Sequence, residues 1–336
     1  MKHDLLHVLT EMKDDFVSGQ QLSDRLGVSR TAIWKHMENL RQEGYVIEAV
    51  PRKGYQLKRR PETLSEAEIK AGLPTRKIGQ TTIYKKSVHS TQTLAKETYR
   101  EGTPHGTTVV ASEQTGGRGR MERPWQSPEN TSISVSIIVK PDISLREAPQ
   151  LTLVTAVAIS DALETISKLP VQIKWPNDIY INDCKVAGIL TEMQAESDQM
   201  QMMVVGIGLN INQKKEQFPA DLQNKATSLY IESGQEWSRT QILQALFVSF
   251  EQWYDLWIKE GFTQIRKMWE HYAGAYNQPV KVIQGNDTIV GHMLGINNEG
   301  VLQLQDQNGQ VHLIYSGDLG LLRRGGHQSE HMPNEK

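Results

Sequence analysis

The residues best suited to chemistry lie in the segment 116–125, which reads GGRGRMERPW. It places glycines, three arginines and one tryptophan directly after the apolar run 108–111. Glycines let backbone N–H groups approach a phosphate, the forked donors of arginine neutralise it, and an indole can stack on a purine. The segment therefore fits a nucleotide-binding loop. Taken alone, it equally fits an arginine-rich surface loop between two strands.

Two further motifs lie downstream, KWPND at 174–178 and KVAGIL at 185–190. Lys185 opens an apolar strand, and by alternation its side chain is expected to share a face with Ala187 and Ile189. A lysine on such a face is costly unless it meets an anion, which favours contact with a carboxylate or a phosphate. The alternative is a lysine at a strand end that extends into water.

In this order and at these separations, GRGR-x-x-R-x-W, KWPND and K-x-AGIL resemble the motifs of bacterial biotin protein ligases. The chain is similar to the subclass that is also the biotin operon repressor, over residues 1–323. The resemblance implies a biotin–[biotin carboxyl-carrier protein] ligase, which forms biotinyl-5′-AMP from biotin and ATP. Biotin then passes to a lysine of the biotin carboxyl carrier protein of acetyl-CoA carboxylase, or of other biotin-dependent carboxylases. The biotinyl-AMP also promotes repression of the biotin synthesis genes.

The resemblance also implies roles for individual residues. Arg118 and Lys185 are expected to be catalytic, because negative charge develops on the carboxylate and the α-phosphate. The residues expected to bind biotin are Ser90, Thr91, Gln92, Gln114, Arg118, Gly119, Arg120, Lys185 and Gly188. Those expected to bind ATP are Arg118, Arg120, Arg123, Trp125, Lys174, Asn177 and Asp178. Mg²⁺ is expected to accompany ATP, and no metal ligands of the protein are assigned.

Several of these residues have a structural alternative. Ser90 or Thr91 can cap a helix, and Trp125 can be a core residue. Asp178 can belong to an ordinary turn, or it can position an arginine or Mg²⁺. Glu122 stands where some relatives carry glycine, and its carboxylate is expected to lower the positive charge of the loop.

A second activity is indicated by residues 1–60, which hold 11 Lys/Arg against 8 Asp/Glu, a net charge of +3. Three helices are predicted there. The second begins at a capping box at Ser18 and stops at Gly27, and the third begins at Ser29. A hairpin with a basic tip at 51–54 follows, which completes the pattern of a winged helix-turn-helix.

The third of these helices is expected to enter the major groove of operator DNA. The expected DNA contacts are Arg30, Thr31, Lys35, Arg52 and Lys53. Because such domains usually bind a two-fold site, we expect a homodimer when biotinyl-AMP is bound. The alternative is a winged domain used for protein contacts.

The remaining elements complete an α+β fold. Residues 61–274 predict a biotin/ATP-binding catalytic domain, whose mixed sheet the resemblance implies to be like that of class II aminoacyl-tRNA synthetases. Residues 275–323 predict an SH3-like β-barrel, and 324–336 a disordered tail. Within the catalytic domain, Gly206 and Gly208 share a strand face, which allows a ligand or a neighbouring chain to approach closely.

Composition excludes several classes of protein. The 336 residues allow two to three domains, and the net charge is −2. No apolar run approaches the ~18–20 residues that a transmembrane helix needs. The single cysteine, Cys184, excludes an internal disulfide framework, and no Cys/His cluster has zinc-site spacing. We therefore expect a cytoplasmic protein without membrane contacts.

Two other functions remain open at this level. One is a transcription factor that senses biotin without catalysis, against which Arg118, Arg120, Lys185 and Trp125 argue. The other is a ligase for lipoate or another acyl group, since such enzymes share the fold.

Overall fold

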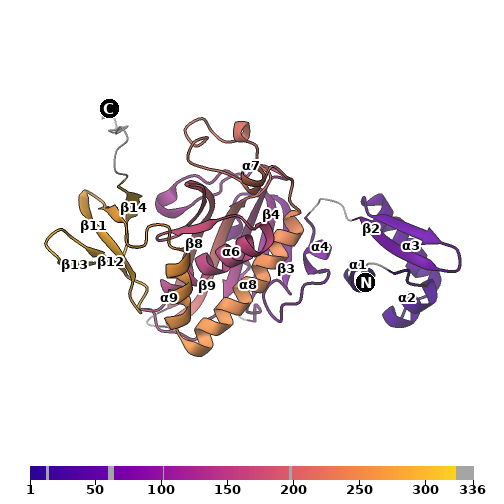
Figure 1. Ribbon diagram of the computed structural model, residues 1–336. Coiled ribbons are helices and arrows are strands. Elements are labelled where there is room, and N and C mark those ends of the chain that lie inside the picture. The colour runs from indigo at the N-terminus through magenta and orange to yellow at the C-terminus, as the bar shows by residue number, and fades with distance from the viewer. Residues whose placement is uncertain (13–14, 60–63, 101, 197–198, 323–336) are drawn as a thin grey trace.

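The computed structural model describes residues 1–12, 15–59, 64–100, 102–196 and 199–322. Three parts follow one another along the chain, and Figure 1 shows the N-terminal and C-terminal parts at opposite ends of the molecule. A helix-turn-helix, a central mixed sheet with helices and a C-terminal antiparallel sheet confirm the predicted α+β class. The predicted tail at 324–336 and the predicted boundary at residue 60 lie outside the described residues.

The N-terminal part is a winged helix-turn-helix whose helix ends follow from capping residues. Its elements are α1 (Lys2–Glu11), α2 (Gly19–Leu26), α3 (Arg30–Gln42), β1 (Val46–Val50) and β2 (Gly54–Arg59). Ser18 and Gln21 form the predicted capping box at the start of α2, and Gly27 ends that helix with φ 67°. The Ser29 side chain accepts a hydrogen bond at the start of α3. These predictions are confirmed.

A short helix, α4 (Glu66–Lys70), packs on both the N-terminal and the central parts. Ala71 belongs to the hydrophobic core of the N-terminal part, and Ala67 packs against that core. Ile69 and Leu73, from the same stretch, belong to the core of the central part. The helix is therefore shared between two cores.

Hydrogen bonds hold α4 from both sides. The hydroxyl of Tyr45, in the N-terminal part, donates to the buried carboxylate of Glu68 over 2.5 Å. From the central part, the amide of Gln244 donates to the Glu68 carbonyl at 3.1 Å and to two further carbonyls of the same stretch at 3.0 Å each. These bonds satisfy carbonyls that a helix end leaves unpaired.

The central part is built on a seven-stranded sheet of order β3-β4-β5-β9-β8-β7-β6, in which only β3 and β4 run parallel. Its strands are β3 (Thr82–Val88), β4 (Thr107–Gln114), β5 (Ser132–Val139), β6 (Val171–Lys174), β7 (Asp178–Ile181), β8 (Cys184–Glu196) and β9 (Gln199–Asn210). The sheet is therefore mixed, as the family resemblance implies.

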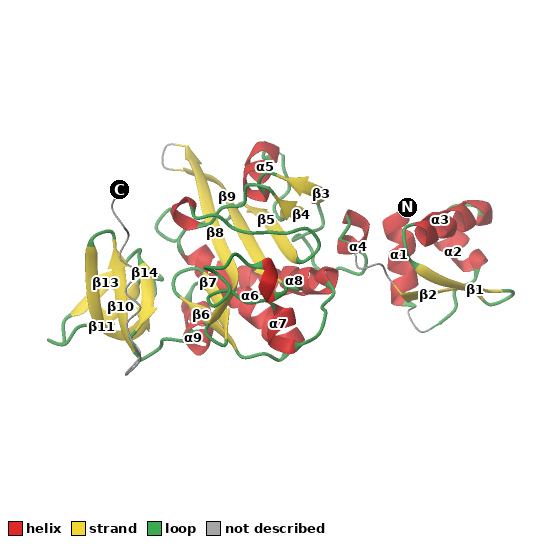
Figure 2. Ribbon diagram, turned by 90° about the horizontal axis from the view of Figure 1, so that it is seen from above, coloured by secondary structure: helices red, strands yellow, loops and turns green. Residues whose placement is uncertain are grey.

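Helices cover the two faces of this sheet unequally. They are α5 (Thr91–Thr98), α6 (Gln150–Ser167), α7 (Leu229–Ser233), α8 (Arg239–Glu260) and α9 (Thr263–Tyr272). The long helices α6 and α8, with α9, bury one face in the main hydrophobic core. Only α5 packs on the other face, over β4, β5 and β9 (Figure 2). The part of this face that α5 leaves uncovered is available for a ligand.

The C-terminal part is a five-stranded antiparallel sheet of order β13-β12-β11-β10-β14. Its strands are β10 (Pro279–Gln284), β11 (Asp287–Ile296), β12 (Leu302–Gln305), β13 (Val311–Ile314) and β14 (Asp318–Leu321). The last strand, β14, pairs with β10 in antiparallel fashion. Among the described helices of the chain, none is long and apolar enough to cross a membrane.

Candidate active site

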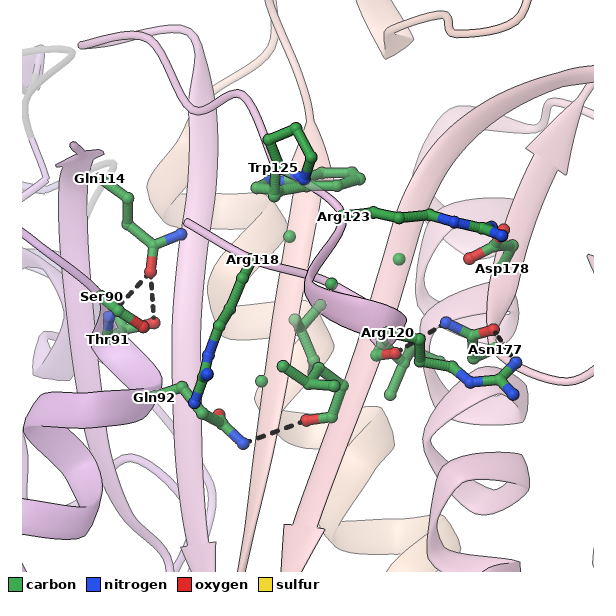
Figure 3. Close-up of a pocket in the computed structure, with 18 of the residues that line it drawn as sticks. Ser90, Thr91, Gln92, Gln114, Arg118, Arg120, Arg123, Trp125, Asn177 and Asp178 are labelled. Carbon is green, nitrogen blue, oxygen red and sulfur yellow. Dashed lines mark hydrogen bonds between the residues drawn. The ribbon is translucent and has the colours of Figure 1, made fainter. Parts of the chain in front are cut away.

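One pocket on the open face of the central sheet gathers most of the predicted ligand-binding residues (Figure 3). The predicted residues that line it are Ser90, Thr91, Gln92, Gln114, Arg118, Gly119, Arg120, Arg123, Trp125, Asn177, Asp178, Lys185 and Gly188. Lys174 lines a neighbouring cavity instead, where its Nζ donates to the hydroxyl of Tyr180 at 3.3 Å. Burial lowers the pKa of Lys174.

Hydroxyl and amide groups form one end of the pocket, at the start of α5. Ser90 is the N-cap of this helix, as its structural alternative predicts. The side-chain oxygen of Gln114 accepts from the backbone N–H of Thr91 at 2.7 Å and from its hydroxyl at 3.0 Å. These bonds fix the Gln114 amide so that its nitrogen points into the pocket (Figure 3). A fixed amide donor suits an acceptor on a ligand.

Gln92 is held more tightly than its sequence neighbours. Its amide nitrogen donates to the carbonyls of Leu190, at 3.2 Å, and Val204, at 3.0 Å. Its amide oxygen accepts from the hydroxyl of Ser136 at 3.0 Å. The side chain is buried, so these bonds attach α5 to the sheet and leave the amide little capacity for a ligand.

Glycines make room for the indole of Trp125 over the sheet. Gly188 of β8 pairs with Gly208 of β9, and a Cβ on Gly208 would lie 2.3 Å from Cε2 of Trp125. Residues 207 and 209, which alternate with the glycines, are Ile207 and Leu209 of the main core. The predicted glycine face is therefore the pocket face.

Lys185 reaches this face through a β-bulge, which corrects one prediction from alternation. Tyr180 pairs with Lys185 but Ile179 pairs with Ala187, so the register shifts at this point. Ala187 and Ile189 lie in the main core, whereas Nζ of Lys185 lies 5.5 Å from the ring centroid of Trp125 in the pocket. The extra residue turns the lysine away from the face that strict alternation predicts.

An acidic partner fixes the ammonium group of Lys185. Its Nζ lies 2.7 Å from Oδ1 of Asp178, which follows the Pro-Asn turn. The same turn positions Asn177, whose amide donates to the carbonyl of Ile189 at 2.9 Å and whose oxygen accepts from Arg120 at 3.2 Å. The KWPND motif thus orients two cations at the pocket.

Arg118 is paired with two carboxylates of its own chain. One of its terminal nitrogens lies 3.0 Å from both oxygens of Glu122, and the other lies 3.4 Å from Glu192. The hydrogen bond that Arg118 donates to Glu122 is the main cause that raises the pKa of Arg118. Met121 and Glu122 have φ of 54° and 56°, a region that disfavours side chains, so this pairing coincides with a strained turn.

Two acidic residues that pair with predicted arginines of the site were not found from the sequence. Asp318 of β14 lines the pocket and forms an ion pair with Arg123, which raises the pKa of that arginine. Nothing in its local sequence distinguishes it from other surface aspartates. Glu192 could have been found, because it alternates with Gly188 along β8 and therefore shares the pocket face.

Three segments of the chain match known protein families. Residues 2–56 match an HTH domain, 84–210 the biotin/lipoate A/B protein ligase family, and 276–319 the biotin protein ligase C-terminal domain. The chain is 46% identical to the bifunctional ligase/repressor BirA of Bacillus spizizenii, across 96% of this chain and 98% of that protein. It is 45% identical to the same protein of Bacillus subtilis, with the same coverage. This chain belongs to the bifunctional ligase/repressor family.

A solved structure supports the same conclusion. The biotin protein ligase of Aquifex aeolicus, in complex with biotin and ATP, is 31% identical and superposes with a TM-score of 0.63. The match covers 73% of this chain and 100% of the Aquifex aeolicus chain. The family and enzyme class that the motifs predict are confirmed: this is a biotin protein ligase that is also a biotin operon repressor.

A ligase/repressor also needs a surface for DNA. The predicted contacts are all exposed on the N-terminal part, and they are Arg30, Thr31, Lys35, Arg52 and Lys53. The first three lie on α3 and the other two in the β1–β2 turn, where Arg52 has φ 65°. Their role in DNA binding stays a prediction.

The pocket offers no ready cage for Mg²⁺. Asp178 is paired with Lys185, and Asp318 with Arg123. In the described part of the chain, no group of three or more His, Cys, Asp or Glu side chains could hold a metal ion. These residues do not fit a resident metal.

Proposed function

We propose that this pocket binds biotin and ATP side by side and joins them. An oxygen of the biotin carboxylate attacks the α-phosphorus of ATP, and pyrophosphate leaves. The lysine amine of the biotin carboxyl carrier protein, or of another biotin-dependent carboxylase, then attacks the acyl carbon. The amide forms, AMP leaves and the amine loses a proton.

The observation that carries this proposal is the environment of Lys185. Its ammonium lies 2.7 Å from Asp178 and 5.5 Å from the Trp125 ring centroid, on the same pocket as Arg118. We assign Lys185 and Arg118 to the carboxylate and the α-phosphate, where fixed cations stabilise developing charge. They also reduce the repulsion between two anionic substrates.

The other pocket residues divide between the two substrates. We assign the ureido ring of biotin to the amide and hydroxyl end, with Gly119 and Gly188 giving close backbone approach. The residues assigned there are Ser90, Thr91, Gln92 and Gln114, with Gln92 acting mainly by holding α5. We assign the adenine to Trp125 and Asn177, and the phosphates to Arg120 and Arg123. Lys174 lines the neighbouring cavity, so its predicted contact with ATP would be made from outside this pocket. Mg²⁺ would be held by the phosphates of ATP, where it would offset their negative charge, and no residue of the chain is assigned to it.

The test is biotin-dependent exchange of labelled pyrophosphate into ATP. We expect Lys185→Ala to lower the exchange rate by about 100-fold or more, the usual cost of one electrostatic group in a transition state. Lys214→Ala is the matched control, because Lys214 lies 5.9 Å from a tyrosine ring but outside the pocket. Equal exchange by both variants would remove Lys185 from the reaction.

Offering lipoate in place of biotin tests the acid specificity in the same assay. Exchange with lipoate but not with biotin would make the chain an acyl-carrier ligase of another kind. Tight biotin binding without any exchange would support a biotin-sensing transcription factor.

For the second activity, we propose that α3 and the wing bind operator DNA through the five exposed residues named above. Two copies of the chain, joined when biotinyl-AMP is bound, would present two such surfaces to a two-fold site. Footprinting with and without biotin and ATP tests the coupling between biotinyl-AMP and DNA binding, and an operator affinity that does not change would contradict it.

We also propose domain boundaries after residues 60 and 274.

A further inference from the structure

Trp34 is exposed on α3, unlike the other tryptophans of the chain. Its relative exposure is 55%, whereas Trp175, Trp257 and Trp269 are at most 4% exposed. The remaining three tryptophans are half-buried. A large indole left in water on a small domain is unusual, because burying it is strongly favourable.

The packing of α3 fixes the direction in which Trp34 points. Ile33, Met37 and Leu40 are at most 1% exposed and form the inner side of the helix. The outer side carries Trp34 one turn after Arg30. Residues four apart lie on the same face of a helix, so the indole and a cation share one surface.

That outer surface combines positive charge with an apolar ring. Its exposed residues in the first half of the helix are Arg30, Thr31, Trp34 and Lys35. Burying this surface against an apolar protein face would leave the two cations beside the indole without counter-charges, which is costly. Duplex DNA offers both kinds of partner, since phosphates attract the cations and the C5-methyl group of thymine is an apolar contact in the major groove.

We propose that Trp34 is a sequence-reading residue that packs on thymine methyl groups in the major groove of the operator. The inference rests on the proposed binding of DNA by α3. Contacts of Lys35 and Arg30 with phosphates fix the position of the helix in the groove. Trp34 then distinguishes thymine from other bases at the base pair that it faces. Trp34 therefore contributes to specificity more than to general affinity.

The test uses a duplex that the full chain itself selects from a random pool in the presence of biotin and ATP. Affinity for this duplex and for an unrelated duplex is measured for the wild type, Trp34→Ala and Trp34→Phe. We expect Trp34→Ala to lower affinity for the selected duplex about tenfold, the cost of one lost base contact. Affinity for the unrelated duplex stays unchanged, and Trp34→Phe keeps part of the preference.

Replacing single thymines by uracil removes only the methyl group and completes a double-mutant cycle. At the contacted positions, uracil weakens binding by the wild type and has no further effect in Trp34→Ala. The inference is overturned if uracil has the same effect in both proteins, or if Trp34→Ala weakens both duplexes equally. Equal weakening of both duplexes would instead indicate a contact of Trp34 with the DNA backbone, which carries no sequence information.

Lys35→Ala separates this inference from the proposed DNA surface. If Lys35→Ala weakens both duplexes and Trp34→Ala weakens neither, only the assignment of Trp34 fails. If neither variant changes any affinity, the surface on α3 fails as well. Alanine favours the helix, so Trp34→Ala is expected to fold, and unchanged biotin-dependent pyrophosphate exchange together with an unchanged thermal transition checks this.

Discussion

Adding one methyl group at Gly208 should displace Trp125 and weaken ATP binding. In Gly208→Ala the new Cβ would lie 2.3 Å from Cε2 and 2.4 Å from Nε1 of the indole. Ordinary contacts between such atoms need about 3.5 Å, so the ring must move by about 1 Å or more. Gly320, on β14 and outside the pocket lining, is the control, because its Cβ would meet nothing closer than 3.5 Å.

The expected cost follows from overpacking. Inserting a methyl group into a filled site costs about 1–3 kcal/mol, and the half-exposed indole can move aside, so we expect the lower half of that range. Once displaced, the ring loses its position near Lys185 and no longer presents a platform for adenine. We therefore expect Gly208→Ala to weaken ATP binding about tenfold, or about 1.4 kcal/mol.

Urea unfolding and calorimetric titration with ATP measure these two effects. The double variant Gly208→Ala/Trp125→Ala should be as stable as the single variant Trp125→Ala, because the clash with the indole is then absent. Affinity for ATP should stay low in the double variant, since the indole is missing. Additive losses of stability, or an equal loss for Gly320→Ala, would refute the reasoning.

Three further substitutions test contacts around the pocket and the core. Glu122→Gln removes the charge that competes for Arg118, so biotin should bind about two- to fivefold more tightly in calorimetry; weaker binding would contradict this competition. Asp318→Asn removes the carboxylate that competes with phosphate for Arg123, so KM for ATP should fall severalfold, while the free energy of unfolding changes by less than about 1 kcal/mol because the ion pair is exposed; an unchanged KM would exclude a role for the C-terminal part through this pair. Burial raises the pKa of Glu251, but three backbone N–H bonds outweigh it and lower the pKa below its usual 4.5. A depressed folded-state pKa stabilises the protein above about pH 4.5, and this stability is lost as the pH falls through the folded pKa. Glu251→Gln should therefore lower the free energy of unfolding, measured with urea at pH 7, by about 1.5–3 kcal/mol. The fall of this free energy at acid pH should also become less steep, and wild-type and variant curves that run parallel with pH would disprove the reasoning.

Local signals in the sequence predicted the parts of the fold that depend on neighbouring residues. Ser18, Gly27 and Ser29 satisfy helix ends within a few residues of themselves, so the helix-turn-helix could be placed before any tertiary contact was known. Strand alternation likewise predicted that Gly206 and Gly208 share one face. The family resemblance assigned 14 ligand residues, and 13 of them line one pocket.

What the sequence did not predict depends on pairing between distant segments. The bulge that turns Lys185 into the pocket lies where this residue pairs with β7 on one side and with the distant segment 225–227 on the other. Asp318 reaches Arg123 across 195 positions of the chain, which no local pattern encodes. Gln92 is a plausible ligand residue by type, yet its amide is occupied by carbonyls of two other strands.

The sharing of α4 between two hydrophobic cores bears on how such a chain can be divided or recombined. A cut in front of Leu64 would leave Ala71 and the Glu68 carboxylate facing water on the enzyme, although both are now at most 2% exposed. A DNA-binding domain taken from another protein would need a hydroxyl donor for Glu68 at the position of Tyr45, and a surface that packs against Ala67. A DNA-binding domain can therefore be exchanged only if its surface matches this short helix. Compatibility between DNA-binding domains and ligase domains should be sought in the residues that contact α4.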